Sequence, residues 1–315
     1  MIPAVLLAAA ALAAAVPAAP VELTAPGPNG PLAGTLIDPG REAPAVLILP
    51  GSGPTDRDGN SPVGLHPDSY RLLAQALAAR GVAALRVDKR GMFGSTAAVP
   101  DPNAVTIADY AADARAWTEV LRAKTGRRCV WLLGHSEGAL VALAAARQAQ
   151  GVCGVVLVAA PGRPLAEVMR EQFRANPANA PIVPQAMATI GSLEQGRRVA
   201  ADTLTAPLST IFNEKVQGFL IDLFRQRPAA EAAALTVPLL IVQGEADLQV
   251  SPADARALAA AQPRATLVLL PRVTHLMKVA AGDDRAANLA TYTDPLLPIA
   301  PGVVEAVASF VTARR

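Results

Sequence analysis

The sequence predicts an α/β fold, with a mostly parallel sheet covered by helices on both faces and a helical cap inserted between two strands. From about residue 44, short continuous apolar runs alternate with segments that have helical apolar spacing. This pattern is typical of parallel strands that are buried on both faces. Alanine supplies much of the 52% hydrophobic share, which favours helices over an all-β architecture. Between about 162 and 234 the alternation stops, and a proline-containing stretch shows helical but no strand pattern, as an inserted cap would.

Two weaker, antiparallel strands are expected at one sheet edge, at 21–24 and 32–37. The buried strands are expected at 45–49, 82–87, 129–133, 155–159, 239–242 and 266–270. Helices are expected at 69–80, 107–124, 137–150, 252–261 and 303–312, the first two ending at Gly81 and Gly126. One core domain therefore spans 20–161 and 235–315, and the cap spans 162–234.

Composition excludes several function classes. The 315 residues carry 28 Lys and Arg against 26 Asp and Glu, and a net charge of +2 gives no footprint for nucleic acid. Charged residues at 17% with a large apolar share exclude disorder, and 3% aromatics argue against a stacking platform for sugars or single strands. No metal-ligand spacing, Walker-type phosphate loop or dinucleotide glycine pattern is present, so no cofactor and no metal are expected.

The start of the chain predicts export. An apolar run covers 4–16 between Pro3 and Pro17, shorter than the ~20 residues that a membrane-spanning helix needs. With small residues at Ala18 and Ala19 it fits a signal peptide over 1–19, although no Lys or Arg precedes it. We expect a periplasmic or secreted protein without membrane association after signal removal. The alternative is an alanine-rich tail on a cytoplasmic protein.

Two cysteines also bear on whether the protein is exported. Cys129 opens one predicted strand and Cys153 stands just before the next. If these strands are parallel neighbours, the Cα atoms lie ~5 Å apart, within the range for a disulfide. The alternative, two buried thiols that act as small hydrophobic groups, stays equally open.

A nucleophile is indicated at Gly134-His135-Ser136-Glu137-Gly138, which follows a buried strand and opens a helix. A nucleophile on such a tight turn needs neighbours without side chains, because the backbone comes close there. The turn exposes the Ser136 hydroxyl and places it at the helix N-terminus, whose N–H groups suit a developing oxyanion.

The base can be found by elimination among three histidines. His135 adjoins the serine, and its side chain is expected to point away. His66 lies in an upstream loop. His275 follows the last strand, at the sheet edge where ligands bind in parallel α/β folds, and we expect it to accept the proton of Ser136.

The acid that orients the imidazole is expected to be Asp247, which follows the strand 239–242, one βα unit before His275. Glu245 is the reserve candidate. Three later carboxylates would break the chain order of serine, acid and histidine; they are Asp283, Asp284 and Asp294.

An oxyanion hole needs two backbone donors. The N–H of Glu137 is expected to supply one, at the start of the helix. The loop Pro50-Gly51-Ser52-Gly53-Pro54 is expected to supply the other, from Ser52 first and from Gly53 second.

These motifs together resemble the α/β-hydrolase superfamily. The resemblance rests on Gly134–Gly138, on Gly244-Glu-Ala-Asp247 and on Thr274-His275. The loop 51–59 and the turn 88–95 are similar to those of exported bacterial hydrolases of the prolyl-oligopeptidase-like and dienelactone-hydrolase-like branches. The resemblance implies an α/β-hydrolase fold and a Ser-His-Asp esterase or peptidase that works without a cofactor. One departure is Pro50, where many relatives carry histidine.

The expected reaction is hydrolysis of a small carboxylic ester through an acyl-enzyme, with oligomeric state left open. A serine aminopeptidase acting on short peptides is the first alternative, and it would need an acidic group for the amino terminus. The candidates for it in the cap are Glu167, Glu171 and Glu214, which are scattered along the segment. A catalytically silent binding protein is the second, although no triad member is lost.

The charged cluster Asp56-Arg57-Asp58 beside the oxyanion loop has two interpretations. Arg57 could bind a substrate carboxylate. We favour the alternative, a self-neutralising network that fixes the loop.

Overall fold

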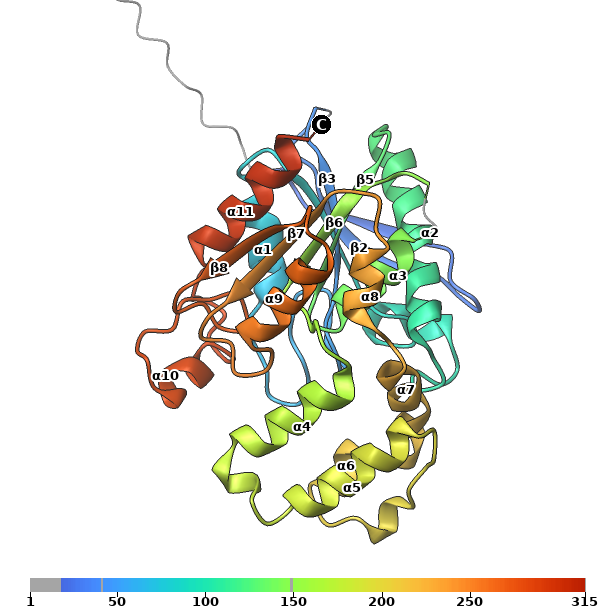
Figure 1. The fold of residues 1–315 in the computed structure, drawn as a ribbon. Coiled ribbons are helices and arrows are strands. Elements are labelled where there is room, and N and C mark those ends of the chain that lie inside the picture. The colour runs from blue at the N-terminus through green and yellow to red at the C-terminus, as the bar shows by residue number, and fades with distance from the viewer. Residues whose placement is uncertain (1–17, 41, 148–149, 315) are drawn as a thin grey trace, which may run out of the picture.

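The structure, a computed structural model, describes residues 18–40, 42–147 and 150–314. Its centre is a sheet with the strand order β1-β2-β4-β3-β5-β6-β7-β8 (Figure 1). The strands are β1 (Val21–Ala25), β2 (Leu32–Ile37), β3 (Ala45–Leu49), β4 (Ala83–Val87), β5 (Val130–His135), β6 (Val152–Val158), β7 (Leu239–Gly244) and β8 (Thr266–Leu270). The pairs β1–β2 and β2–β4 are antiparallel and all other pairs are parallel, which confirms the predicted α/β class and its antiparallel edge.

Alternation along the central strands builds a core on each face of the sheet. In β3, Leu47 and Leu49 pack on one side, whereas Val46 and Ile48 pack on the other. All four are buried, as the continuous apolar run predicts for a strand covered on both faces.

Helices cover both faces. The first face carries α1 (Ser69–Ala78) and α11 (Pro301–Thr312). The second carries α2 (Ile107–Thr125), α3 (Gly138–Ala146), α8 (Pro228–Ala233) and α9 (Pro252–Ala261). Capping residues set both ends of helix α2. Thr106 and Asp109 form a capping box at its start, and Gly126 ends it with a φ of 72°.

Between β6 and β7 the described chain forms only helices. Helices α4 (Leu165–Ala175), α5 (Val183–Glu194), α6 (Leu208–Ile211) and α7 (Glu214–Phe224) lie beyond the carboxyl ends of the strands (Figure 1). Helix α8, which the predicted cap includes, packs instead against α3 and α9 of the core. Short 3-10 helices cover Phe93–Ala98, Pro177–Asn179 and Ala201–Thr203, and α10 (Arg285–Ala290) follows β8.

Two carboxylates attach the cap to the core. Asp254 of α9 accepts hydrogen bonds from the N–H groups of Gly162 and Arg163, at 3.0 and 3.1 Å, where the chain leaves β6. Asp222 of α7 accepts one from the N–H of Ile107 at 2.8 Å, at the start of α2. A core carboxylate thus holds the backbone where the cap begins, and a cap carboxylate holds the backbone at the start of α2.

Cys129 and Cys153 form a disulfide with a Cα–Cα distance of 5.1 Å. Because β5 and β6 are parallel neighbours, the two residues lie at the same end of the sheet. Of the two interpretations left open, the disulfide is confirmed.

Residues 1–17, which hold most of the predicted signal peptide, lie outside the described residues. Within the described ranges, no helix combines the length and apolarity needed to cross a bilayer. No group of three or more His, Cys, Asp or Glu in those same ranges could hold a metal ion.

Candidate active site

Ser136 occupies a strained turn between β5 and α3. Its φ of 54° lies in the left-handed region that non-glycine residues rarely adopt. Gly134 and Gly138 make the turn possible, because a Cβ at Gly134 would lie 2.2 Å from the Gly138 carbonyl oxygen and one at Gly138 would lie 2.3 Å from that of Leu49. Strain of this kind is characteristic of functional sites, and here it brings Ser136 to the wall of a cavity.

His275 and Asp247 are hydrogen-bonded. The distance from His275 Nδ1 to Asp247 Oδ2 is 2.8 Å, and both side chains are buried. Asp247 Oδ1 accepts hydrogen bonds from the N–H groups of Gln249 and Val250, at 2.7 and 2.9 Å. Burial by itself would raise the pKa of the Asp247 carboxyl, but His275 and these N–H donors hold it below its usual value. Asp247 therefore stays ionised and fixes which nitrogen of His275 carries the proton.

The parallel strands β5, β7 and β8 end at one sheet edge, and the turn of Ser136, Asp247 and His275 follow them in that order. The His275 ring lies 4.8 Å from the ring of His135, the residue that precedes the serine.

The other candidates for the base and the acid lie on the surface. His66 and Glu245 are exposed, as are the three later carboxylates Asp283, Asp284 and Asp294. Asp284 caps α10 through the N–H of Ala287. None of them competes with Asp247 for the imidazole.

His135 does not line the cavity, but it contacts His275, and no local pattern in the sequence predicts this contact. Its Nε2 lies 2.8 Å from the His275 carbonyl oxygen, and its Nδ1 lies 2.8 Å from Tyr70 Oη. Burial, with a contribution from the nearby His275, lowers the pKa of His135 to about 3, so the ring is neutral at physiological pH. A carbonyl can only accept, so Nε2 carries the proton and Nδ1 accepts from Tyr70.

Tyr70 in turn accepts a hydrogen bond from the N–H of Gly51 at 2.9 Å. A continuous chain of hydrogen bonds thus connects the oxyanion loop, through Tyr70 and His135, to the backbone of His275. The sequence offered no signal for this chain, because its members are separated by 19 to 140 residues.

The residues that carry the predicted oxyanion donors line the cavity. Ser52, Gly53 and Glu137 line it together with Ser136. Among the described residues, no protein acceptor takes a hydrogen bond from the backbone N–H of Ser52, Gly53 or Glu137. These groups are free to bind a ligand oxygen.

A buried ion pair lies in the cavity wall. Lys89 Nζ is 3.7 Å from Glu137 Oε1 and 2.8 Å from the Gly51 carbonyl oxygen. Burial lowers the pKa of Lys89 and raises that of Glu137, while each charge opposes the shift of the other. Lys89 lies in the turn 88–95, on which the resemblance partly rests, but no local pattern in the sequence marks it as part of the site.

The cavity lies between the core and the cap and has a volume of about 560 Å³. Its wall is mostly apolar, with contributions from α2, α4 and α7; the apolar residues include Tyr110, Leu165, Val168, Met169, Val216, Phe219, Leu220 and Leu223. Glu137, paired with Lys89, is the one carboxylate among the described residues that line it. The site therefore suits an uncharged, largely apolar group next to Ser136.

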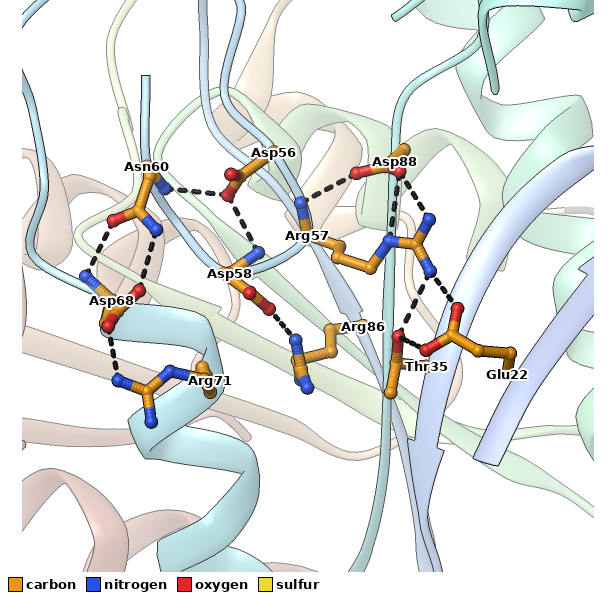
Figure 2. Close-up of polar contacts among 10 residues, drawn as sticks. All are labelled: Glu22, Thr35, Asp56, Arg57, Asp58, Asn60, Asp68, Arg71, Arg86 and Asp88. Atoms are coloured by element: carbon orange, nitrogen blue, oxygen red, sulfur yellow. Dashed lines mark hydrogen bonds and ion pairs between the residues drawn. The ribbon is translucent and has the colours of Figure 1, made fainter. Parts of the chain in front are cut away.

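The charged cluster next to the oxyanion loop is a structural network (Figure 2). Arg57 donates to Asp88 at 3.0 Å and to Glu22 at 2.5 Å. Asp56 accepts hydrogen bonds from the N–H groups of Asp58 and Asn60 at 2.9 and 2.8 Å, which closes the loop on itself. Because Arg57 is occupied by these partners and does not line the cavity, the structure supports the favoured interpretation, a network that fixes the loop.

Solved structures confirm the fold class. The chain superimposes on an esterase from Pyrococcus furiosus with a TM-score of 0.58 at 15% identity, covering 94% of this chain and 93% of that one. An esterase from Thermogutta terrifontis gives 0.55 at 18% identity, covering 94% and 99%. A puromycin-hydrolysing peptidase from Mycobacterium tuberculosis gives 0.58 at 16% identity, covering 94% of this chain and 39% of that one.

Sequence comparison identifies the family as well as the fold. Esterase EstD of Thermotoga maritima is 29% identical over 241 residues, which is 75% of this chain and 51% of EstD. The chain thus spans about half the length of this curated relative. A family model described as serine aminopeptidase, S33 matches residues 63–278, which include Ser136, Asp247 and His275. The chain therefore belongs to this serine aminopeptidase family of the α/β-hydrolase superfamily.

Proposed function

We propose that the protein is a serine hydrolase that cleaves small carboxylic esters through an acyl-enzyme, with Ser136, His275 and Asp247 as its catalytic triad. The observation that carries this proposal is the 2.8 Å hydrogen bond between His275 and Asp247, at the sheet edge where Ser136 reaches the cavity. The similarity to EstD supports the same chemistry.

In the acylation step, Ser136 Oγ attacks the ester carbonyl carbon while His275 Nε2 takes its proton. Asp247 stabilises the imidazolium. The negative oxygen of the tetrahedral intermediate accepts hydrogen bonds from the N–H groups of Ser52 and Glu137. As the intermediate collapses, the alcohol leaves with the proton from His275. Water then attacks the acyl-enzyme by the same route, which releases the acid and restores Ser136.

The family description favours a second candidate, an aminopeptidase. Such an enzyme needs a carboxylate to bind the substrate's ammonium group. Glu171 pairs with Arg163 on the cap surface, and neither Glu167 nor Glu214 lines the cavity. Glu137 is neutralised by Lys89. These contacts favour an uncharged ester over a free amino terminus.

We further propose that the protein acts in the periplasm or is secreted. The Cys129–Cys153 disulfide supports an oxidising compartment, and the apolar run at 4–16 supports export. Cell fractionation of the full chain tests this.

The activity is tested with p-nitrophenyl acetate and butyrate, an aminoacyl p-nitroanilide, and the Ser136→Ala variant as control. Ester hydrolysis that Ser136→Ala abolishes is the expected result. Equal activity in wild type and variant would remove Ser136 from the mechanism, and faster cleavage of the anilide would favour the aminopeptidase. A fluorophosphonate probe separates both enzymes from a silent binding protein, which would remain unlabelled.

A further inference from the structure

Lys89 connects the two segments that carry the proposed oxyanion donors. It follows β4 in the turn beside the oxyanion loop, and its side chain is buried. Its ammonium group donates to the Gly51 carbonyl oxygen at 2.8 Å and lies 3.7 Å from Glu137 Oε1. It also lies 5.7 Å from the centre of the Tyr110 ring. The cation thus contacts both the loop before Ser52 and the residue after Ser136.

The contact with Gly51 fixes the direction of the Ser52 N–H. The carbonyl of Gly51 and the N–H of Ser52 belong to one peptide group, and in a trans peptide they point in opposite directions. Holding the carbonyl against Lys89 therefore turns the N–H away from Lys89. On its other side, the N–H of Gly51 is held by Tyr70 Oη at 2.9 Å. Both peptide groups that flank Gly51 are thereby fixed.

Packing holds this peptide group from one side only, because Gly51 is buried whereas Ser52, Gly53 and Pro54 are exposed. The side chain of Thr55 donates back to the Ser52 carbonyl at 2.9 Å, which constrains the next peptide group but not the one that carries the Ser52 N–H.

The positive charge of Lys89 also strengthens the Ser52 N–H as a donor. A hydrogen bond from an ammonium group polarises the peptide and makes its N–H a better donor to an anion. The ion pair with Glu137 ties the same ammonium to the segment that carries the second donor.

We propose that Lys89 is a positioning residue for the oxyanion hole, holding the Gly51–Ser52 peptide so that the Ser52 N–H points at the developing negative charge. This inference rests on the proposed function. It also ranks Ser52 above Gly53 as the donor, because the Gly51 carbonyl that Lys89 holds shares its peptide group with Ser52.

The competing explanation is that Lys89 only neutralises Glu137, since an unpaired buried charge is strongly destabilising. Two variants separate the two roles. Lys89→Met removes both contacts, and the double variant Lys89→Met with Glu137→Gln also removes the unpaired charge. Arg127→Met is the matched control, because Arg127 is a largely buried cation that donates to the Gly40 carbonyl at 2.6 Å, near the amino-terminal ends of the strands.

The readouts are kcat and KM for p-nitrophenyl butyrate, the inhibition constant of an alkyl trifluoromethyl ketone, and thermal unfolding. The ketone forms a charged adduct with the serine and so reports on the oxyanion hole, whereas KM reports mainly on the acyl pocket. Removing an oxyanion donor costs ~10²–10³ in rate, so we expect misdirecting one to lower kcat by about 10- to 100-fold. Ketone affinity should fall by the same factor, with KM within about threefold of the wild-type value.

In the double variant both losses should persist, whereas Arg127→Met should lower the unfolding temperature without either loss. Wild-type kcat and ketone affinity in Lys89→Met, or their recovery in the double variant, would overturn the inference. Should Lys89→Met not fold, the double variant, which carries no unpaired carboxylate, is compared directly with the wild type, and wild-type kcat and ketone affinity in it would overturn the inference. The Ser136→Ala control keeps the two proposals apart, since ester hydrolysis that depends on Ser136 but not on Lys89 contradicts only this one.

Discussion

His135 Nε2 donates a hydrogen bond to the carbonyl oxygen of His275 at 2.8 Å, so the residue before the proposed nucleophile holds the backbone of the proposed base. The same imidazole accepts from Tyr70, which accepts from Gly51 of the oxyanion loop. One neutral histidine therefore links three segments of the site, and its effect should be measurable in stability as well as in activity.

Stability should fall as the pH is lowered from about 6.5, because of His135. Burial lowers the pKa of this ring to about 3 in the folded protein, against 6.5 as its ordinary value. Below pH 6.5 the unfolded chain takes up a proton that the folded protein refuses, so protonation favours unfolding. Between pH 6.5 and 4.5 the wild type should lose about 2 to 3 kcal/mol from this group.

Urea unfolding at several pH values tests this, with His135→Gln as the comparison. Glutamine offers both a donor and an acceptor but does not titrate, so its free energy of unfolding should decline less over the same interval. Parallel curves for the two proteins would contradict a depressed pKa at His135.

Asp247→Asn should lower kcat by about 10⁴-fold, the loss typical when the acid of a serine triad is replaced. Two N–H groups, those of Gln249 and Val250, already bind Asp247 Oδ1, so an asparagine oxygen would take that place. Its NH₂ group would then face His275 Nδ1 and force the other tautomer. Burst and steady-state kinetics with p-nitrophenyl butyrate measure the effect, and circular dichroism checks the fold. A loss of less than tenfold would exclude Asp247 as the acid.

Butyrate esters should be cleaved more efficiently than acetate esters. Each buried methylene contributes ~0.8 kcal/mol, so two additional ones predict about a tenfold gain in kcat/KM. Leu220→Trp, which adds bulk to the α7 wall of the cavity, should reverse this preference and leave acetate little affected. A chain-length series with both proteins measures it. An unchanged series in Leu220→Trp would place the acyl group outside this cavity.

Replacing both Cys129 and Cys153 by alanine should destabilise the protein by about 3 kcal/mol, because the disulfide closes a loop with a sequence separation of 24. Esterase activity at low temperature should remain, since the bond lies at the opposite end of β5 from Ser136. Thermal unfolding of the variant and of the wild type with and without a reductant provides the measurement. An unfolding temperature that responds to neither change would show that the bond adds no stability.

The sequence by itself determined the order of strands and helices and the proposed triad. Continuous apolar runs identify buried strands, and the Gly134–Gly138 turn identifies the serine. With three histidines in the chain, elimination then leaves His275. These features are local: each depends on spacing within a few residues, or on the rule that parallel strands end at one edge.

Tertiary structure alone decided how the site is held. Whether the two cysteines bond, where α8 packs and how Lys89, Tyr70 and His135 fix the oxyanion loop all depend on contacts between residues far apart in the chain. Local pattern carries no information about such pairs, because a buried polar side chain can be satisfied by any backbone group that folding brings within reach. The partners of these three residues follow from the packing of α1 and the β4 turn against the carboxyl edge of the sheet, and only the folded chain shows that packing.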